Sequence, residues 1–312
     1  MSWNQPGESR FGIHSIDHFA LEVPSLSQAK DFFGCFGLEV SDTGANRLDL
    51  RTFGNPHVWG RIHEGARKRL AYLGLHCYAN EYEALVAQIR AHGGRPAPAY
   101  GGAEPEGFWF LDPDGNLLRL KVGPKTTPSA MTPPTDKAQR AGHRGVTGHE
   151  AVQTVRPRRL SHVLLFSSDI DRSIAFYRDA LGLRLSDRSR DIVAFLHARH
   201  GSDHHLVAFA ASSASGWHHS SWDVAGIDEV GLGAEQMRRG GYLQGWGTAR
   251  HVLGSNYFHY VRDPWGSFAE YSADMDFVPA GATWAAGDHP PEDSLYLWGP
   301  AVPDYFIQNS EA

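Results

Sequence analysis

The chain has 312 residues, a formal net charge of -6 and a sequence pI near 6.3. This length predicts two domains, since single domains usually hold about 100–200 residues. Hydrophobic residues make up 41% of the chain and charged residues 21%, which is typical of a globular protein and excludes a disordered one. The mild acidity argues against nucleic acid or an acidic membrane surface as a partner, because both select basic patches.

Cysteine usage and hydropathy exclude further classes of protein. The two cysteines, Cys35 and Cys77, are too few for a disulfide-stapled scaffold, a four-cysteine zinc site or a cysteine-held iron–sulfur cluster. No apolar run approaches the ~18–20 residues that a membrane helix needs. The N-terminal residues have neither the basic start nor the apolar core of a secretory signal. We therefore expect a cytoplasmic protein with no membrane partner.

The chain contains an internal repeat, which is visible first in two long segments. Residues 16–39 and 160–183 both predict a short apolar strand with a histidine near its start, followed by a polar turn and a helix. The helical spacing is clearest in SIAFYRDALG, with Asp169 or Asp171 as the N-cap and Gly182 at the C-terminal end.

Two further pairs of segments complete the repeat. Residues 73–92 and 216–239 each predict a histidine-containing strand followed by an amphipathic helix, and 108–121 and 258–272 each predict a hairpin around an Asp-Pro-x-Gly turn. The matched positions lie 144, 143 and 151 residues apart, for His18 and His162, His76 and His219, and Asp112 and Asp263.

The repeat predicts an α+β fold of two tandem modules, each a pair of βαβββ units whose mixed sheet curves around a central funnel. We place the N-terminal module at 1–121 and the C-terminal module at 160–275. Residues 122–159, rich in Pro, Thr and Gly, predict a linker or an ordered strap packed on the body. Residues 276–312 form a tail, which we expect to cover the site as a lid or to pack at a subunit contact.

Histidine points to the C-terminal module, because eight of the 18 histidines lie between residues 197 and 259. His162, His219 and Glu270 lie on three predicted strands of this copy. Two imidazoles and one carboxylate on one face of a metal form the facial triad of non-haem Fe(II) oxygenases, which leaves positions open for substrate and oxygen. The alternative is that these residues are satisfied members of the core.

The first copy serves as an internal control for this metal site. It has His18 and His76 where the second copy has its histidines, but Arg119 stands in place of the carboxylate. A guanidinium stays charged and cannot ligate a cation. We therefore expect the first copy to be metal-free, with structural histidines.

Other polar and aromatic residues cluster around the predicted site. His205, His251 and Tyr260 lie on or beside predicted strands and could serve in proton transfer, or could be surface and core residues. Arg250 or Arg262 could meet an anionic substituent of a substrate, or form surface ion pairs. Aromatic side chains that could line a pocket, or belong to the core, are Trp217, Trp222, Trp246, Tyr257 and Trp265.

The segment RHVLGSNYFHYVRDPWGSFAEYS carries a family resemblance. It has His251, then Tyr260 nine residues later and Glu270 ten residues after that. With the preceding repeat, it resembles the type I extradiol ring-cleavage dioxygenases, such as catechol 2,3-dioxygenase, of the vicinal oxygen chelate superfamily. The resemblance covers nearly the whole chain, since these enzymes also have an inactive first module and a linker.

The resemblance implies a role for each candidate residue. His162, His219 and Glu270 would bind Fe(II), with Mn(II) as an alternative metal, and no organic cofactor is implied. His205 would be the acid–base residue on the oxygen side, and His251 and Tyr260 would hydrogen-bond the bound catecholate. In the pair His218–His219, we choose His219 as the ligand by its spacing from His205.

The implied reaction inserts both atoms of O₂ into a substituted catechol or trihydroxybenzene, with meta cleavage next to the diol, in aromatic-compound degradation. The partners would be a small aromatic diol and O₂. Members of this family are often symmetric assemblies, so the resemblance also implies a homo-oligomer. Alternatives are a hydroxyphenylpyruvate-type oxygenase, a glyoxalase-like isomerase and a non-enzymatic protein that binds aromatic ligands. The absence of a carboxylate at Arg119 argues against the isomerase, whose metal site is shared between modules.

Overall fold

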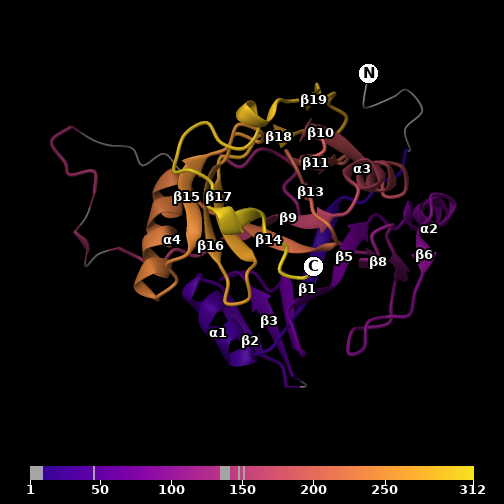
Figure 1. Cartoon of the computed structure of the whole chain (residues 1–312), viewed down its shortest axis with the longest axis horizontal. Helices are drawn as coiled ribbons and strands as arrows, with labels where there is room; N and C mark the ends of the chain where they lie inside the picture. Colours follow the sequence, from indigo (N-terminus) through magenta and orange to yellow (C-terminus); the bar gives the residue numbers. More distant parts are fainter. Residues whose placement is uncertain (1–9, 45, 134–140, 147, 150–151) are drawn as a thin grey trace.

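Two large mixed sheets form the body of the protein (Figure 1). The computed structural model describes residues 10–44, 46–133, 141–146, 148–149 and 152–312. The N-terminal sheet, drawn in indigo to purple, lies beside the orange C-terminal sheet, and the yellow tail runs over the latter. This α+β architecture confirms the predicted fold class.

The N-terminal sheet is built from two βαβββ units in chain order. Its elements are β1 (Ser15–Val23), α1 (Leu26–Cys35), β2 (Glu39–Asp42), β3 (Arg47–Arg51), β4 (Gly60–Glu64), β5 (Arg69–Cys77), α2 (Tyr82–Ala91), β6 (Arg95–Pro96), β7 (Phe108–Leu111) and β8 (Leu117–Val122). The strand order is β2-β3-β4-β1-β5-β8-β7-β6.

The C-terminal module repeats this plan around its own large sheet and adds one short strand, β12, that lies outside that sheet. Its elements are β9 (Arg159–Ser167), α3 (Ile170–Asp179), β10 (Leu183–Ser189), β11 (Val193–Ala198), β12 (Ser202–Asp203), β13 (Val207–Ala211), β14 (Gly216–Asp223), α4 (Ile227–Arg239), β15 (Gly245–Arg250), β16 (Tyr257–Arg262) and β17 (Phe268–Ala273). Read from the β10 edge, the order β10-β11-β13-β9-β14-β17-β16-β15 matches that of the first sheet, and β19 of the tail adds one more edge strand.

The local signals place the helix and turns as expected. Asp169 caps α3 by accepting a hydrogen bond from the Arg172 backbone N–H at 3.0 Å, so the earlier of the two predicted caps is the correct one. Gly182 follows α3 with a φ of +67°, a conformation that favours glycine. Both Asp-Pro-x-Gly segments turn between antiparallel strands, β7–β8 and β16–β17.

The strand registers correct one detail of the repeat. Ser221 on β14 lies opposite His162 and Glu270, and Gly74 on β5 lies opposite Arg119. Arg119 stands at the place of Glu270, so its neighbour Gly74 stands at the place of Ser221. His219 lies two residues before Ser221, and the residue two before Gly74 is Tyr72. The predicted match of His76 with His219 is therefore wrong by four residues. An even shift keeps a side chain on the same face of a strand, which is why the error leaves the hydrophobic pattern intact.

Aromatic side chains join the two modules. Phe36 stacks on Tyr271 with ring centroids 3.9 Å apart, and the Tyr271 hydroxyl donates to the Phe36 carbonyl at 2.8 Å. Phe19 packs against Trp217 with centroids 4.8 Å apart. These residues belong to one buried cluster with members from both sheets, so the modules share a core.

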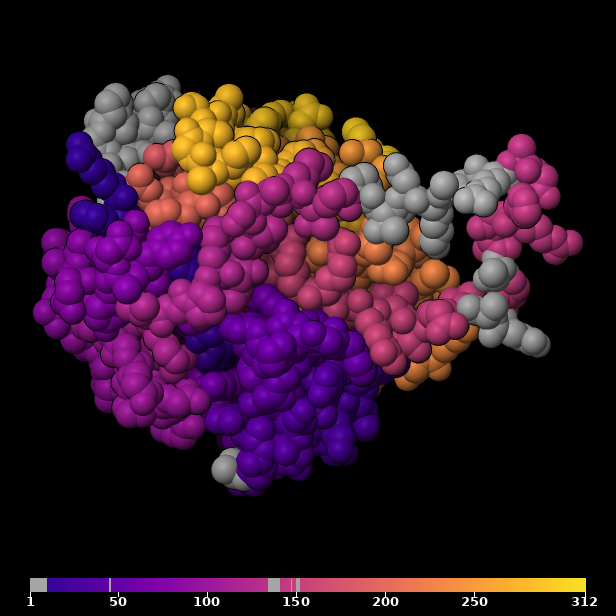
Figure 2. Space-filling view, turned by 180° about the vertical axis from the view of Figure 1, so that it is seen from behind, coloured from indigo at the N-terminus to yellow at the C-terminus, as the bar shows by residue number. Residues whose placement is uncertain are grey.

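The connecting segment after β8 packs partly on the body. Thr127 is buried, and its hydroxyl donates to the His14 carbonyl at 2.8 Å. Figure 2 shows this segment, in magenta, running across the boundary between the two modules. Residues 134–140, in the middle of the predicted linker, lie outside the described residues.

The tail folds back onto the C-terminal module. It contains β18 (Phe277–Val278), β19 (Gly287–Asp288), η2 (Pro291–Asp293) and η3 (Asp304–Ile307). β18 pairs with β12, and β19 pairs with β10. Within the described ranges, no helix is long and apolar enough to cross a membrane.

Candidate metal centre

Three neighbouring strands place His162, His219 and Glu270 on one face of the C-terminal sheet. His162 lies on β9 and Glu270 on β17, and both pair with Ser221 on the intervening β14. His219 precedes Ser221 by two residues, so its side chain shares the same face. The register of the sheet therefore brings together three residues that are 57 and 51 positions apart.

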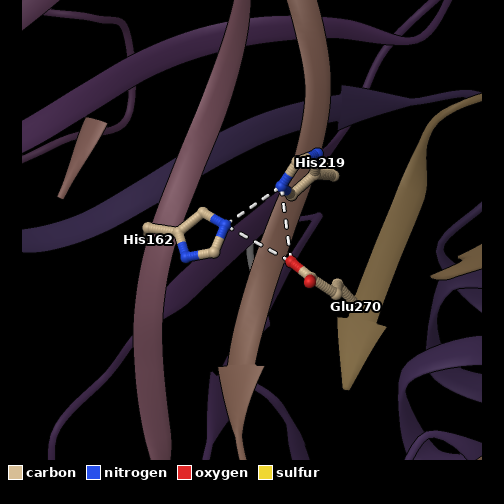
Figure 3. Close-up of side chains that lie close together, drawn as sticks. All are labelled: His162, His219 and Glu270. Atoms are coloured by element: carbon tan, nitrogen blue, oxygen red, sulfur yellow. Dashed lines mark hydrogen bonds and ion pairs between the residues drawn. The ribbon is translucent and has the colours of Figure 1, made fainter. Parts of the chain in front are cut away.

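The three side chains meet in a tight, buried group (Figure 3). The Nε2 atoms of His162 and His219 lie 3.2 Å apart, and they lie 3.3 and 3.5 Å from Glu270 Oε2. Side-chain exposure is 2% for both histidines and 0% for the glutamate. Among the residues that the structure describes, no other group of His, Cys, Asp and Glu has this spacing.

Hydrogen bonds define the tautomer of His219. His218 Nε2 lies 2.8 Å from the Phe306 carbonyl, which can only accept, so His218 carries its proton there. Its Nδ1 then accepts from His219 Nδ1, 2.7 Å away. His219 Nε2 is left with a free lone pair inside the group. Burial, and then the neighbouring His218 and His162, lowers the pKa of His219 well below its ordinary value, which favours this neutral form.

A second chain of polar groups orients His162. The Ser161 hydroxyl donates to Asp203 Oδ2 at 2.9 Å and thus offers its oxygen to His162 Nδ1, 3.4 Å away. Arg159 pairs with the same carboxylate at 2.7 Å. His162 therefore also presents Nε2 as a lone pair. Partners of this kind fix the orientation of metal-binding histidines.

Glu270 completes this group of potential metal ligands, and no Lys or Arg side chain of the described residues pairs with its carboxylate. Its Oε1 accepts from Asn256 Nδ2 at 3.2 Å, whereas Oε2 is buried and has no hydrogen-bond partner in the described part of the chain. An orphaned carboxylate oxygen beside two imidazole lone pairs fits a divalent cation.

The predicted acid–base residues surround this group. The rings of His205 and His162 have centroids 4.0 Å apart. His205 is 4% exposed, and burial, followed by the nearby histidines, lowers its pKa well below the ordinary value. A neutral imidazole in this position can accept a proton from a group bound next to His162.

His251 and Tyr260 form a hydrogen-bonded pair on the other side of Glu270. His251 Nδ1 donates to the Leu295 carbonyl of the tail at 2.5 Å, so Nε2 accepts from the Tyr260 hydroxyl at 3.0 Å. His251 Nε2 lies 3.8 Å from Glu270 Oε1. Burial raises the pKa of Tyr260 well above its ordinary value, and Glu270 adds to the effect, so the hydroxyl keeps its proton.

The equivalent place in the N-terminal module holds a different set of residues. His18 Nε2 lies 2.8 Å from the Tyr72 hydroxyl, at the positions that match His162 and His219. Arg119 is buried and pairs with Asp17 Oδ2 at 2.8 Å. His76 lies 3.3 Å from Asp17 Oδ1. A buried cation with its counter-ion thus occupies the place of the metal group.

The aromatic residues that could line a pocket lie in different places: the shared core, the site and the surface. Trp217 and Trp222 are buried in the core shared by the modules, so they do not line the site. Trp246 instead lies parallel to Tyr260, with centroids 5.7 Å apart. Trp265 lines a surface cleft of about 570 Å³ with Arg262. The Arg250 guanidinium donates a hydrogen bond to the Tyr257 hydroxyl at 3.0 Å.

Sequence reasoning missed several partners of the site residues. Asn256 donates a hydrogen bond to Glu270. It stands four residues before Tyr260, inside the segment that carries the family resemblance, and this position could have indicated a role at the site. Phe306 and Leu295 contribute backbone carbonyls, for which a sequence offers no signal. Ser221 is visible only once the strand register is known.

Comparisons with known proteins match both the site and the whole chain. Residues 159–271 match the Glyoxalase/Bleomycin resistance protein/Dioxygenase superfamily. Metapyrocatechase 2 of Cupriavidus necator is 55% identical over 97% of this chain and 94% of its own length. The iron-dependent extradiol dioxygenase of Rhodococcus jostii strain RHA1 is 28% identical over 61% of this chain and 62% of its own. The Mn(II)-bound glyoxalase of Novosphingobium aromaticivorans shares the fold, with a TM-score of 0.75, 23% identity and coverage of 96% of this chain and 95% of that one.

Proposed function

Because this chain belongs to the extradiol ring-cleaving dioxygenases, we propose that it binds Fe(II) through His162, His219 and Glu270 and cleaves a catechol with O₂. The observation that carries the proposal is the buried donor set, two imidazole lone pairs around a carboxylate oxygen without a partner. The 55% identity to metapyrocatechase 2 over almost the full chain supports a catechol as the substrate class. The bond broken would be the ring bond next to the diol.

Fe(II), when bound, would acidify the diol hydroxyls and carry electron density from the aromatic ring to dioxygen. The two histidines and the carboxylate would hold it on one side, leaving the opposite side for the reactants. The second copy alone would hold this ion, since Arg119 and Tyr72 stand at the matching places of the first. Mn(II) is an alternative, because the ligand set does not discriminate strongly between the two ions.

The residues around the donor set would move and hold protons. His205 would take a proton from one diol hydroxyl at its Nε2 and return a proton to the cleaved oxygen later. The Tyr260 hydroxyl, which donates to His251 in the free protein, would turn its single proton to a substrate oxygen next to Glu270. Buried donors of this kind act without reorganisation of water, so they stabilise developing negative charge more than water does.

The remaining assignments extend this proposal to the whole chain. Modules at 1–121 and 160–275, joined by 122–159, would form one catalytic unit with the chemistry in the second. The tail at 276–312 would act as a lid, because Leu295 and Phe306 bond to His251 and His218 beside the site. We place the protein in the cytoplasm and in aromatic-compound degradation, as a homo-oligomer.

The test is anaerobic loading of the purified chain with Fe(II), followed by a diol and air. Catechol, 3-methylcatechol and 2,3-dihydroxybiphenyl sample substituents of increasing size. We expect oxygen uptake and a yellow ring-opened product with at least one of them. Protein shown to hold one Fe(II) per chain that takes up no oxygen with any diol would contradict the proposal. Loading with Mn(II) in parallel decides between the two metals.

A further inference from the structure

A chain of hydrogen bonds leads from His205 toward the surface. His205 Nδ1 lies 3.1 Å from His204 Nδ1, and His204 Nε2 lies 2.8 Å from Asp187 Oδ2. The other oxygen of Asp187, Oδ1, lies 2.8 Å from His289 Nε2. The His204 side chain is fully buried, whereas 36% of the His289 side chain is exposed. The four side chains therefore connect the interior of the site with solvent.

The tail supplies the outer end of this chain. β19 pairs with β10 beside Asp187, and the Gly287 backbone N–H donates to Asp187 Oδ1 at 2.9 Å. The Trp284 indole donates to Asp187 Oδ2 at 3.2 Å. Asp187 thus has four donors, which matches the acceptor capacity of an ionised carboxylate, and these partners, His204 first, lower its pKa despite burial.

The carboxylate also determines which nitrogen of His205 carries a proton. An ionised carboxylate can only accept, so neutral His204 holds its proton on Nε2 and offers Nδ1 as a lone pair. His205 must then donate from Nδ1 to His204. Its Nε2 is left as a base, which is the form needed to accept a proton from a diol.

The neighbouring pair His218–His219 shows why the carboxylate matters. There too, two adjacent histidines share an Nδ1–Nδ1 contact, but the outer one donates to a backbone carbonyl, the Phe306 oxygen. A backbone carbonyl can only accept a hydrogen bond, whereas the carboxylate of Asp187 can also take the proton itself. Of these two pairs, His204–His205 is therefore the one whose outer partner can pass a proton on.

We propose that His204, Asp187 and His289 form a proton path between His205 and solvent. The inference rests on the acid–base role proposed above for His205. A proton taken up at His205 Nε2 releases the His205 Nδ1 proton to His204 Nδ1. His204 passes its Nε2 proton to Asp187 Oδ2, and the carboxyl turns. The His289 ring, which donates to Asp187 from Nε2 at rest, turns to present its Nδ1 lone pair, takes the proton there and releases its Nε2 proton to water. One proton leaves the diol and one reaches water, so the charges balance.

The first test removes the outer end of the path, where the fold is least at risk. In Fe(II)-loaded protein, His289→Ala should lower kcat for catechol about tenfold, less than the ~10²–10⁴-fold loss expected for an acid–base residue itself. Added imidazole, a small proton carrier, should restore the rate. His92→Ala, at an exposed histidine of the other module, is the matched control and should show neither effect. Wild-type protein in the same imidazole corrects for binding of imidazole to iron.

The second test reads the tautomers without turnover. Nitrogen NMR of isotope-labelled histidine, in the full chain loaded with diamagnetic Zn(II), should show the His205 proton on Nδ1 and the His204 proton on Nε2. Asp187→Asn removes the charge and should abolish this preference. If Asp187→Asn does not fold correctly, the spectrum of the wild-type protein and the kcat of His289→Ala still test the proton path.

The outcomes separate this proposal from the proposed function. Absence of ring cleavage in the wild type contradicts the proposed function, and the NMR measurement still tests the tautomers. With an active wild type, His289→Ala at full kcat and without a response to imidazole would overturn the path. A His205 proton on Nε2 in the resting protein would overturn it as well.

Discussion

His218 should tune metal binding without touching the metal, and the His218→Phe variant isolates this effect. The variant removes the acceptor for His219 Nδ1 and the donor to the Phe306 carbonyl. Loss of the partner that orients a ligating histidine typically lowers metal affinity 10–100-fold, about 1.4–2.7 kcal/mol. The aromatic ring is kept, so contacts with Phe166, Phe268 and Phe306, at 4.8 to 5.3 Å between centroids, are retained.

The variant should also lower the free energy of unfolding, because the buried Phe306 carbonyl loses its donor at a cost of ~1–3 kcal/mol. Anaerobic competition between the protein and a chromogenic Fe(II) chelator gives the affinity, and urea unfolding gives the stability. His259→Phe is the matched control, since His259 adjoins Tyr260 on β16 and points to the opposite face. Wild-type Fe(II) affinity in His218→Phe would refute the inferred tautomer of His219.

Three further changes test the site and the core. Glu270→Ala should abolish stoichiometric iron binding, measured by metal analysis, and an unchanged iron content would show that the carboxylate is not a ligand. His205→Ala should keep iron and diol binding but lower kcat by ~10²–10⁴-fold, so a normal kcat would remove it from proton transfer. His14 is buried, and burial, followed by His76, His200 and Lys125, lowers its pKa to about 4. Since an unfolded histidine titrates near ~6.5, the unfolded chain binds the extra proton below that pH, and the free energy of unfolding falls as pH drops from about 6.5 to 4. His14→Phe should make this fall shallower in urea unfolding at about pH 7 and about pH 5, and an unchanged slope would contradict the lowered pKa.

The repeat and the donor set could be predicted because both depend on periodic patterns. A strand places every second side chain on one face, so the positions of His162 and Glu270 in matching strands of one copy are enough to indicate a shared face. The same periodicity explains the error at His76, since a shift of four residues preserves the face and only the strand register reveals Tyr72 at the matching place.

The orientation of the site residues could not be predicted, because it depends on contacts with distant backbone. His218 bonds to the carbonyl of Phe306, 88 residues away, and His251 bonds to that of Leu295, 44 residues away. Any residue offers a carbonyl, so composition and spacing carry no trace of these bonds. The same applies to Asp187 and His289, which the tail brings together over 102 residues.

Ring cleavage under ¹⁸O₂ tests the proposed reaction most directly. The Fe(II)-loaded chain is mixed with catechol, and the product is reduced at once so that its aldehyde oxygen cannot exchange with water. Mass spectrometry should find two heavy oxygen atoms in a product whose ring is opened next to the diol. A product with one heavy atom or none, or one opened between the two hydroxyl-bearing carbons, would contradict extradiol cleavage by this site.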